Sequence, residues 1–276
     1  MIIDSHQHFW QLARGDYTWI TPKLKSLYRD FYPQDLQSHL VACGIQGTIL
    51  VQAAPTLEET YFLLSIAKKN EFIKGVVGWA DMEAENAPTV IGELAKNRAI
   101  VGIRPMIADI ADSDWMLSER LTPAFKRIAE CNLTFDALIQ PRHIKNLTRL
   151  LARHPNLKIV VDHAAKPAIK NNQFEPWASD LASLAKNSQV YCKLSGLVTE
   201  AGRSWTYTDL KPYIDHIVYC FGAKRILWAS DWPLLTVITT YFTWHELCQK
   251  YIDQYFPLEK ASVFGKTAAK VYGLAK

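Results

Sequence analysis

Eight short apolar runs recur along the chain, separated by longer stretches of mixed polarity. Most of these runs are nearly continuous in Val, Ile and Leu, as is typical of parallel strands buried on both faces. The first run, Met1-Ile2-Ile3, is expected to open a strand that ends at His8. The other expected strands cover residues 48–51, 75–79, 100–104, 133–138, 158–163, 190–196 and 225–231.

The intervening stretches carry signals for helix ends. Pro33 is expected to begin a helix that Gly44 closes, and Thr56 to Glu59 has the capping-box pattern of a helix start. A long aromatic segment, residues 9–32, precedes the first helix, and loops of this length are usually functional. Further helices are expected near residues 90–97, 118–131, 141–154, 177–187 and 208–221, with more after the last strand.

The alternation of eight strands with helices in 276 residues predicts an α/β fold of the (β/α)8 TIM-barrel type. We expect a single domain over residues 1–276, with a helical C-terminal extension. The rival is a doubly wound open sheet, which would place a glycine-rich phosphate loop after the first strand. Residues 4–10 contain no glycine, so the barrel is preferred.

Composition and charge limit the kinds of molecule that the protein is expected to bind. The net charge of +4 comes from scattered residues without a basic block, so neither nucleic acid nor an anionic membrane surface is expected. We find no run of transmembrane length and no signal-peptide pattern at the start. The five cysteines lack metal-ligand spacing, and their odd number argues against a disulfide framework. A reduced, cytoplasmic setting is therefore expected.

The clearest chemical signal, Asp4-Ser5-His6-Gln7-His8, directly follows the first apolar run. Residues two apart share one face of a strand, so we expect Asp4, His6 and His8 on one side. Two adjacent imidazoles on a rigid strand can bind a metal or polarise a substrate oxygen together. Taken alone, the pair could equally be two unrelated polar residues at a strand exit.

Other unusual polar residues fall at strand ends, where a TIM barrel carries its chemistry. Arg104 ends the fourth expected strand, His163 the sixth and Asp231 the eighth. Lys193 lies late in the seventh strand and Asp136 within the fifth. Each has a structural explanation by itself, such as an ion pair for Arg104. Their joint placement predicts that three histidines and one aspartate converge at one mouth of the barrel.

Five sequence pieces appear in an order that is known from one superfamily. They are Asp4-Ser5-His6-Gln7-His8-Phe9-Trp10, Gly102-Ile103-Arg104, Val161-Asp162-His163 with Lys166-Pro167, Lys193-Leu194-Ser195-Gly196-Leu197 and Leu227-Trp228-Ala229-Ser230-Asp231-Trp232-Pro233. The chain thus resembles the amidohydrolase superfamily, and within it the lactonase branch that includes L-fuconolactonase, L-rhamnono-lactonase and 2-pyrone-4,6-dicarboxylate lactonase. The resemblance implies a catalytic centre made of His6, His8, His163 and Asp231.

The resemblance also bears on the cofactor. Binuclear members of the superfamily place a metal-bridging lysine or glutamate on strand four or five. This chain has no convincing equivalent, since Asp136 is an uncertain substitute and Arg104 cannot ligate. At most one divalent metal is expected, and zinc suits three imidazoles with one carboxylate. The resemblance does not exclude a centre that works without metal. The implied ligands are His6, His8, His163 and Asp231.

The implied reaction is hydrolysis of a sugar lactone, such as L-fucono- or L-rhamnono-lactone, to the open-chain acid. Asp231 would be the general base that takes a proton from the attacking water. The three histidines would polarise the lactone carbonyl, directly or through the metal ion. Arg104 is expected to stabilise the oxyanion or bind a substrate hydroxyl, and Lys193 is a second candidate. Trp10 and Trp79 are expected to stack on the sugar.

Two alternatives remain beside this small-molecule lactonase. A metal-dependent decarboxylase of an aromatic acid uses similar groups on the same barrel. A non-catalytic sugar-binding barrel would be expected to have lost one or more of the four central residues, and all four are present. The sequence leaves open the sugar, the ring size of the lactone and whether the protein is a homo-oligomer.

Overall fold

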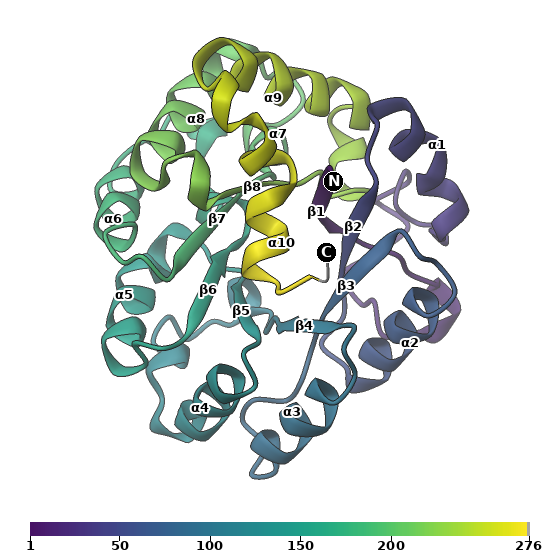
Figure 1. Cartoon of the computed structure of the whole chain (residues 1–276), viewed down its shortest axis with the longest axis vertical. Helices are drawn as coiled ribbons and strands as arrows, with labels where there is room; N and C mark the ends of the chain where they lie inside the picture. The colour runs from purple at the N-terminus through teal and green to yellow at the C-terminus, as the bar shows by residue number, and fades with distance from the viewer. Residues whose placement is uncertain (275–276) are drawn as a thin grey trace.

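Eight parallel strands form a barrel surrounded by helices in the computed structural model, which describes residues 1–274 (Figure 1). Each strand pairs with the next one along the chain, from β1 through β8. This confirms the predicted TIM barrel. The strands are β1 (Ile3–Gln7), β2 (Gly47–Val51), β3 (Ile73–Gly78), β4 (Ile100–Ile103), β5 (Thr134–Ala137), β6 (Lys158–Val161), β7 (Val190–Leu194) and β8 (Ile226–Trp228).

The outer helices begin and end close to the predicted residues. Pro33 lies in the first turn of α1, and Gly44 ends that helix with a left-handed φ of 66°. The Thr56 side chain accepts a hydrogen bond from the Glu59 amide at the start of α2. None of the helices within residues 1–274 is long and apolar enough to cross a membrane. The helices are α1 (Pro33–Cys43), α2 (Leu57–Ala67), α3 (Ala87–Ala95), α4 (Thr122–Glu130), α5 (Ile144–Arg153), α6 (Trp177–Leu184), α7 (Leu197–Ala201), α8 (Tyr207–Phe221), α9 (Tyr241–Tyr255) and α10 (Thr267–Val271).

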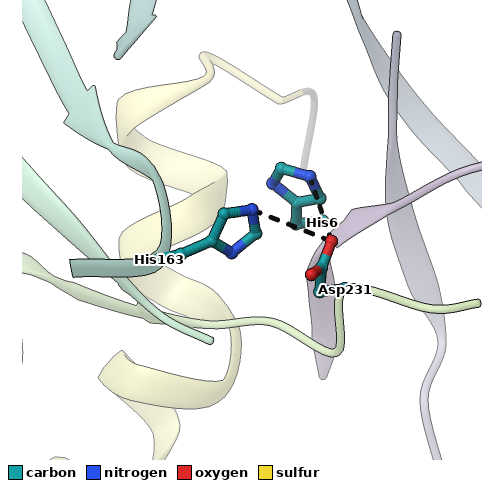
Figure 2. A group of neighbouring side chains, drawn as sticks. All are labelled: His6, His163 and Asp231. Carbon is teal, nitrogen blue, oxygen red and sulfur yellow. Dashed lines mark ion pairs between the residues drawn. The ribbon is translucent and has the colours of Figure 1, made fainter. Parts of the chain in front are cut away.

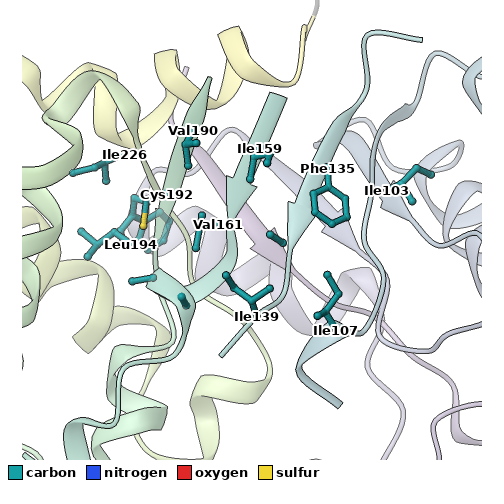
Figure 3. Close-up of a cluster of buried hydrophobic side chains, with 14 of the residues drawn as sticks. Ile103, Ile107, Phe135, Ile139, Ile159, Val161, Val190, Cys192, Leu194 and Ile226 are labelled. Atoms are coloured by element: carbon teal, nitrogen blue, oxygen red, sulfur yellow. The ribbon is translucent and has the colours of Figure 1, made fainter. Parts of the chain in front are cut away.

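Side chains alternate between two apolar layers along the strands. The outer layer, which includes Phe135, Ile159 and Val190, lies between the strands and the helices (Figure 3). The inner layer fills the barrel and includes Ile3, Val160 and Leu227. Helix α10 and the residue that follows it add Ala268, Val271 and Tyr272 to this inner layer. The helical C-terminal extension thus covers one end of the barrel (Figure 1).

Strands β1 and β8 close the barrel through few backbone contacts. The His8 amide donates to the carbonyl oxygen of Trp232 at 2.8 Å, and the Asp231 amide to that of His6 at 2.9 Å. The Asp4 carboxylate spans the same seam, where it accepts hydrogen bonds from the Ser230 amide at 2.9 Å and the Ser230 hydroxyl at 2.6 Å. This seam brings His6 of β1, and His8 directly after it, beside Asp231.

The expectation that Asp4 shares a face with His6 and His8 is wrong. Asp4 accepts a hydrogen bond from Tyr241 of the outer helix α9, whereas His6 contacts Lys193 inside the barrel. The pairing register of β1 shifts between Asp4 and Gln7. Such an irregularity inserts a residue into the alternation and redirects the side chains beyond it.

Candidate active site

Two histidines of β1 and its exit lie at the mouth of the barrel. His6 and His8 are both buried, and their Nε2 atoms are 3.0 Å apart. The Nδ1 atom of His8 is 2.8 Å from the carbonyl oxygen of Val51. This contact fixes the ring of His8 on β2 and directs its other nitrogen toward His6.

His163 follows β6 on a turn with unusual backbone geometry. Residues 163–166 all have positive φ, with φ of 51° at His163 and 54° at Lys166. Residues other than glycine seldom adopt this conformation, and such strain gathers at functional sites. The Ser195 hydroxyl is hydrogen-bonded to Nδ1 of His163 at 2.8 Å. A side chain at Gly196 would collide with the ring of His163, since an added Cβ would lie 2.6 Å from the His163 Cβ.

Asp231 follows β8, also with a positive φ, of 60°. Its Oδ1 atom lies 3.4 Å from Nε2 of His8 and 3.7 Å from Nε2 of both His6 and His163. Figure 2 shows His6, His163 and Asp231 pointing toward one another from three separate segments. Among residues 1–274, no group donates a hydrogen bond to this buried oxygen.

Three of these four side chains form a group that could hold a single divalent ion. His6, His163 and Asp231 each offer one ligand atom, all within 4.8 Å of one another. His8 lies outside this group, although its Nε2 is 3.0 Å from Nε2 of His6 and 3.4 Å from Oδ1 of Asp231. Ligands about 2.0–2.1 Å from a tetrahedral zinc ion are themselves roughly 3.3 Å apart. The observed spacing and the unpaired Asp231 oxygen agree with such a site.

Burial sets the charges of these groups. It lowers the pKa of His6 and His8, and it lowers that of His163 to about 4. Burial alone would raise the pKa of Asp231, but the neighbouring histidines, His163 foremost, outweigh it and hold this pKa below its usual value. At neutral pH the centre therefore contains one carboxylate and three neutral imidazoles, which leaves lone pairs for a metal or a proton.

Arg104 extends from the end of β4 into the same site. Its Nε donates to the Gln52 side chain at 2.8 Å, and its Nη1 donates to Asp162 at 3.1 Å. Nη2 donates to the backbone carbonyl oxygen of Gln52. These contacts use three of the five guanidinium N–H donors. Arg104 also lines the cavity, so its remaining donors are available to a ligand.

A cavity of about 260 Å³ is lined by three of the four central side chains, His8, His163 and Asp231. Ligand cavities are typically about 300–1,000 Å³ with mainly apolar walls and a few polar groups, so this one suits a single small ligand. Its polar rim includes Lys166 and Glu200, which form an ion pair at 2.9 Å. Its apolar wall includes Trp19, Met106, Leu138 and Leu234.

The tryptophans do not lie where the sequence predicted. Trp10 is completely buried, and its indole N–H donates to the carbonyl oxygen of Arg29 at 2.7 Å. Neither Trp10 nor Trp79 is among the described residues that line the cavity. Trp19 takes that position, with its indole N–H bound to the carbonyl oxygen of Ala53 at 2.7 Å. The aromatic segment, residues 9–32, was expected to contact the ligand, but the sequence did not identify Trp19 as the residue that lines the cavity.

Lys193 also departs from its predicted role in substrate binding. Its side chain is completely buried, between Asp136 at 2.6 Å and Asp162 at 2.8 Å. Its Nζ lies 3.1 Å from Nδ1 of His6, beneath the cavity rather than in it. Asp136 pairs with this lysine and does not face the metal ligands. Arg104 is thus the one predicted substrate-binding residue that reaches the cavity.

Comparison with known proteins places this barrel in a family. A model of the amidohydrolase family matches residues 3–274. The chain is 42% identical over 274 residues to an L-fucono-1,5-lactonase of Burkholderia ambifaria, covering 98% of this chain and 94% of that protein. It is 31% identical over 284 residues to an L-fucono-1,5-lactonase of Burkholderia multivorans, covering 99% and 96%.

A solved structure agrees with these sequence matches. The crystal structure of an amidohydrolase from Burkholderia multivorans with bound zinc superposes with a TM-score of 0.93 at 31% identity. The superposition covers 100% of both chains. The family match also extends over nearly all the described residues and includes the four central side chains. The chain belongs to the amidohydrolase family.

Proposed function

We propose that this protein is a lactonase that hydrolyses a sugar 1,5-lactone, with L-fucono-1,5-lactone as the first candidate, to the open-chain acid. The observation that carries the proposal is the unpaired, ionised Oδ1 of Asp231, which lines a small cavity together with His8 and His163 and lies 3.7 Å from Nε2 of His6. The similarity to two L-fucono-1,5-lactonases supports the choice of substrate.

Asp231 acts as the general base. Its carboxylate is ionised at neutral pH and lines the cavity, so it can take a proton from a water molecule beside the lactone carbonyl. The water oxygen forms a bond to the carbonyl carbon, and the ring C–O bond then breaks. Asp231 returns its proton to the ring oxygen, which leaves as a hydroxyl group. The product is the hydroxy acid, and Asp231 is again ionised.

Arg104 stabilises the negative charge that develops on the carbonyl oxygen. Gln52 and Asp162 hold its guanidinium group in place, so its free N–H donors need little reorganisation during the reaction. Loss of one such donor typically lowers kcat by roughly 100-fold or more. The Lys166–Glu200 pair at the rim offers charged groups to sugar hydroxyls, and Leu234, which also lines the cavity, offers an apolar contact.

The candidate metal ligands are His6, His8, His163 and Asp231. An ion bound there would act as a Lewis acid on the lactone carbonyl. We propose zinc, because imidazole nitrogens and a carboxylate oxygen are its usual ligands and a related amidohydrolase binds it. Acid release before and after chelation, with metal analysis of the same samples, tests whether the ion is needed.

We also propose a cytoplasmic location. All five cysteines, which lie within the described residues, are unpaired, as expected in a reducing compartment. The apparent mass of the protein in a non-reducing gel of freshly lysed cells, with and without thiol blocking, tests whether the thiols are free in the cell.

The proposed reaction is tested with a panel of lactones. Acid release is measured with a pH indicator on L-fucono-, L-rhamnono- and D-galactono-lactones and on an aromatic pyrone, each corrected for spontaneous opening. Fast turnover of a sugar lactone supports the proposal. Carbon dioxide release from an aromatic acid without lactone opening supports the decarboxylase, and ligand binding without turnover supports a sugar-binding barrel.

A further inference from the structure

Lys193 lies directly beneath the candidate metal ligands and contacts three groups. Its Nζ is 2.6 Å from Asp136, 2.8 Å from Asp162 and 3.1 Å from Nδ1 of His6. Lys193 donates a hydrogen bond to the Asp136 carboxylate and forms an ion pair with that of Asp162. The side chain is completely buried, so water does not compete for these contacts.

The contact with His6 determines where that ring carries its proton. An ammonium group has three N–H donors and no acceptor, so Nδ1 of His6 must accept the hydrogen bond from Lys193. An Nδ1 atom that accepts a hydrogen bond carries no proton, and His6 Nε2 lies 3.0 Å from Nε2 of His8. The proton of His6 is therefore on Nε2, the nitrogen that faces the site.

The neighbouring ring leads independently to the same assignment. Nδ1 of His8 lies 2.8 Å from the carbonyl oxygen of Val51, which can only accept a hydrogen bond. His8 therefore carries its proton on Nδ1, and its Nε2 has a free lone pair. The Nε2 atoms of the two rings are 3.0 Å apart, and the proton between them must come from His6. The bonds run from Lys193 through His6 and His8 to Val51.

Asp162 is the only acceptor in this network that could favour the other tautomer of His6. Its Oδ1 atom is 3.5 Å from Nδ1 of His6, beyond the usual 2.7–3.2 Å of an N–H···O bond. The same carboxylate already pairs with Lys193 and accepts a hydrogen bond from Arg104 at 3.1 Å. Lys193 is therefore the better-placed partner of His6.

We propose that Lys193 is a positioning residue that holds His6 in the Nε2–H tautomer and thereby weakens the binding of a divalent metal ion. Histidine ligates a metal through an unprotonated nitrogen. His6 can join the metal site only when its proton moves from Nε2 to Nδ1 and its bond with Lys193 is lost. Without metal, the Nε2–H of His6 donates to Nε2 of His8. This inference concerns the candidate metal site and does not depend on which substrate the protein hydrolyses.

The first test reads the tautomer in the metal-free wild-type protein. Long-range proton–nitrogen NMR spectra of protein labelled with ring-15N histidine distinguish Nε2–H from Nδ1–H rings. The His6 signals are identified by their loss in a His6→Gln variant. We expect Nε2–H for His6 and Nδ1–H for His8. An Nδ1–H ring at His6 would overturn the proposal.

The second test measures zinc affinity by calorimetry. Removing Lys193 alone would leave two buried carboxylates uncompensated, which is strongly destabilising. The Asp136→Asn variant is therefore compared with the Asp136→Asn/Lys193→Met double variant. We expect the double variant to bind zinc at least tenfold more tightly, roughly the effect of losing one competing hydrogen bond, with its metal-free His6 in the Nδ1–H form.

Two outcomes of the calorimetry would contradict the proposal. Equal or weaker zinc affinity in a folded double variant would show that Lys193 does not oppose the metal. Tighter binding with the tautomer of His6 unchanged would show an effect of charge alone. If the double variant does not fold, the NMR spectra of the wild-type protein decide whether the proposal holds. Neither readout uses turnover, so a failure here is distinct from a failure to find lactonase activity.

Discussion

At the scale of single residues, the position of His163 depends on the absence of a side chain at Gly196. Gly196 has a φ of 70°, and a Cβ there would lie 2.6 Å from the Cβ of His163 and 3.0 Å from its Nδ1. We predict that Gly196→Ala displaces the ring and lowers kcat/KM by about 100-fold, the usual cost of misplacing a reacting group by about 1 Å. Steady-state kinetics measure this.

Gly202 provides the matched control for that variant. It also has a positive φ, of 82°, but the nearest atom to an added Cβ is a side-chain carbon of Lys170 at 3.7 Å. Both alanine variants should lose about 1–3 kcal/mol of stability, because Gly196 is left-handed and Gly202, with a ψ of −175°, has a conformation that is nearly confined to glycine. Gly202→Ala should keep near wild-type kcat/KM. Equal loss of activity in the two variants would mean that the contact with His163 is unimportant.

Glu59 should make stability depend on pH. Its buried carboxyl accepts hydrogen bonds from the amides of Ala53 and Ala54 at 2.9 to 3.1 Å, yet burial raises its pKa to about 7. A pKa above the unfolded value of about 4.5 means that the folded state holds its proton more tightly. The contribution of the Glu59 carboxyl group to the free energy of unfolding is therefore greatest below pH 4.5, and it is lost as the pH rises to 7.

The Glu59→Gln variant isolates this contribution. The free energy of unfolding of the wild type, minus that of the variant, should fall by up to about 3 kcal/mol between pH 4.5 and 7 and then level off. Urea unfolding at a series of pH values measures it. A difference that rises over this range would show that the two backbone amides, rather than burial, control the carboxyl group.

The sequence predicted the residues at strand ends better than those elsewhere. His6, His8, His163 and Asp231 meet as expected, because the barrel brings the carboxyl ends of its strands to one mouth. The role of Lys193 was not predictable, because strand periodicity gives the face of a side chain and not its depth or partners.

At the scale of elements, the seam between β1 and β8 determines how the histidines meet Asp231. The Ser230 hydroxyl donates a hydrogen bond to the Asp4 carboxylate at 2.6 Å and accepts one from the Trp232 amide at 2.9 Å. Ser230 and Trp232 directly precede and follow Asp231, so these bonds hold the backbone on both sides of it. We predict that Ser230→Ala lowers both stability, by about 1–2 kcal/mol, and kcat/KM, by roughly tenfold. Thermal unfolding and steady-state kinetics measure the two effects.

Tyr241 contacts the same carboxylate from outside the barrel. Its hydroxyl donates to Asp4 at 2.9 Å, and among residues 1–274 no hydrogen bond joins it to the backbone beside Asp231. Tyr241→Phe should therefore cost about 1 kcal/mol and leave kcat/KM within a factor of about three. If Ser230→Ala and Tyr241→Phe lower kcat/KM to the same extent, the seam affects activity only through the overall stability of the protein.

Element boundaries were predictable where local chemistry sets them. Pro33, Gly44 and Thr56 mark helix ends because a fixed φ, a left-handed turn and a side-chain cap are local properties. The register shift between Asp4 and Gln7 was not predictable, because it arises from pairing with a distant strand.

At the scale of the whole molecule, the C-terminal segment completes the core of the barrel. The side chain of Tyr272 joins the inner apolar layer, and its hydroxyl donates to Asp136 at 2.7 Å. We predict that Tyr272→Ala destabilises the protein by about 3–5 kcal/mol, whereas Tyr272→Phe costs only about 1 kcal/mol. Urea unfolding compares them. Similar small losses in both would mean that the ring contributes little.

The overall architecture was predictable because strand and helix patterns alternate throughout the chain. A helical C-terminal extension was expected too. Its place over one end of the barrel was not, because an apolar helix face does not identify the surface that it will cover. The tertiary fold alone brings Tyr272 to Asp136, and thus within reach of the network below His6.

The most direct test of the account is the rate of L-fucono-1,5-lactone hydrolysis by the wild type and by Asp231→Asn. The amide is nearly the same size as the carboxylate but cannot take a proton, so it isolates the general base. We predict turnover well above spontaneous opening for the wild type and a fall in kcat of about 100- to 10,000-fold for the variant. An Asp231→Asn protein with wild-type kcat would contradict the central claim.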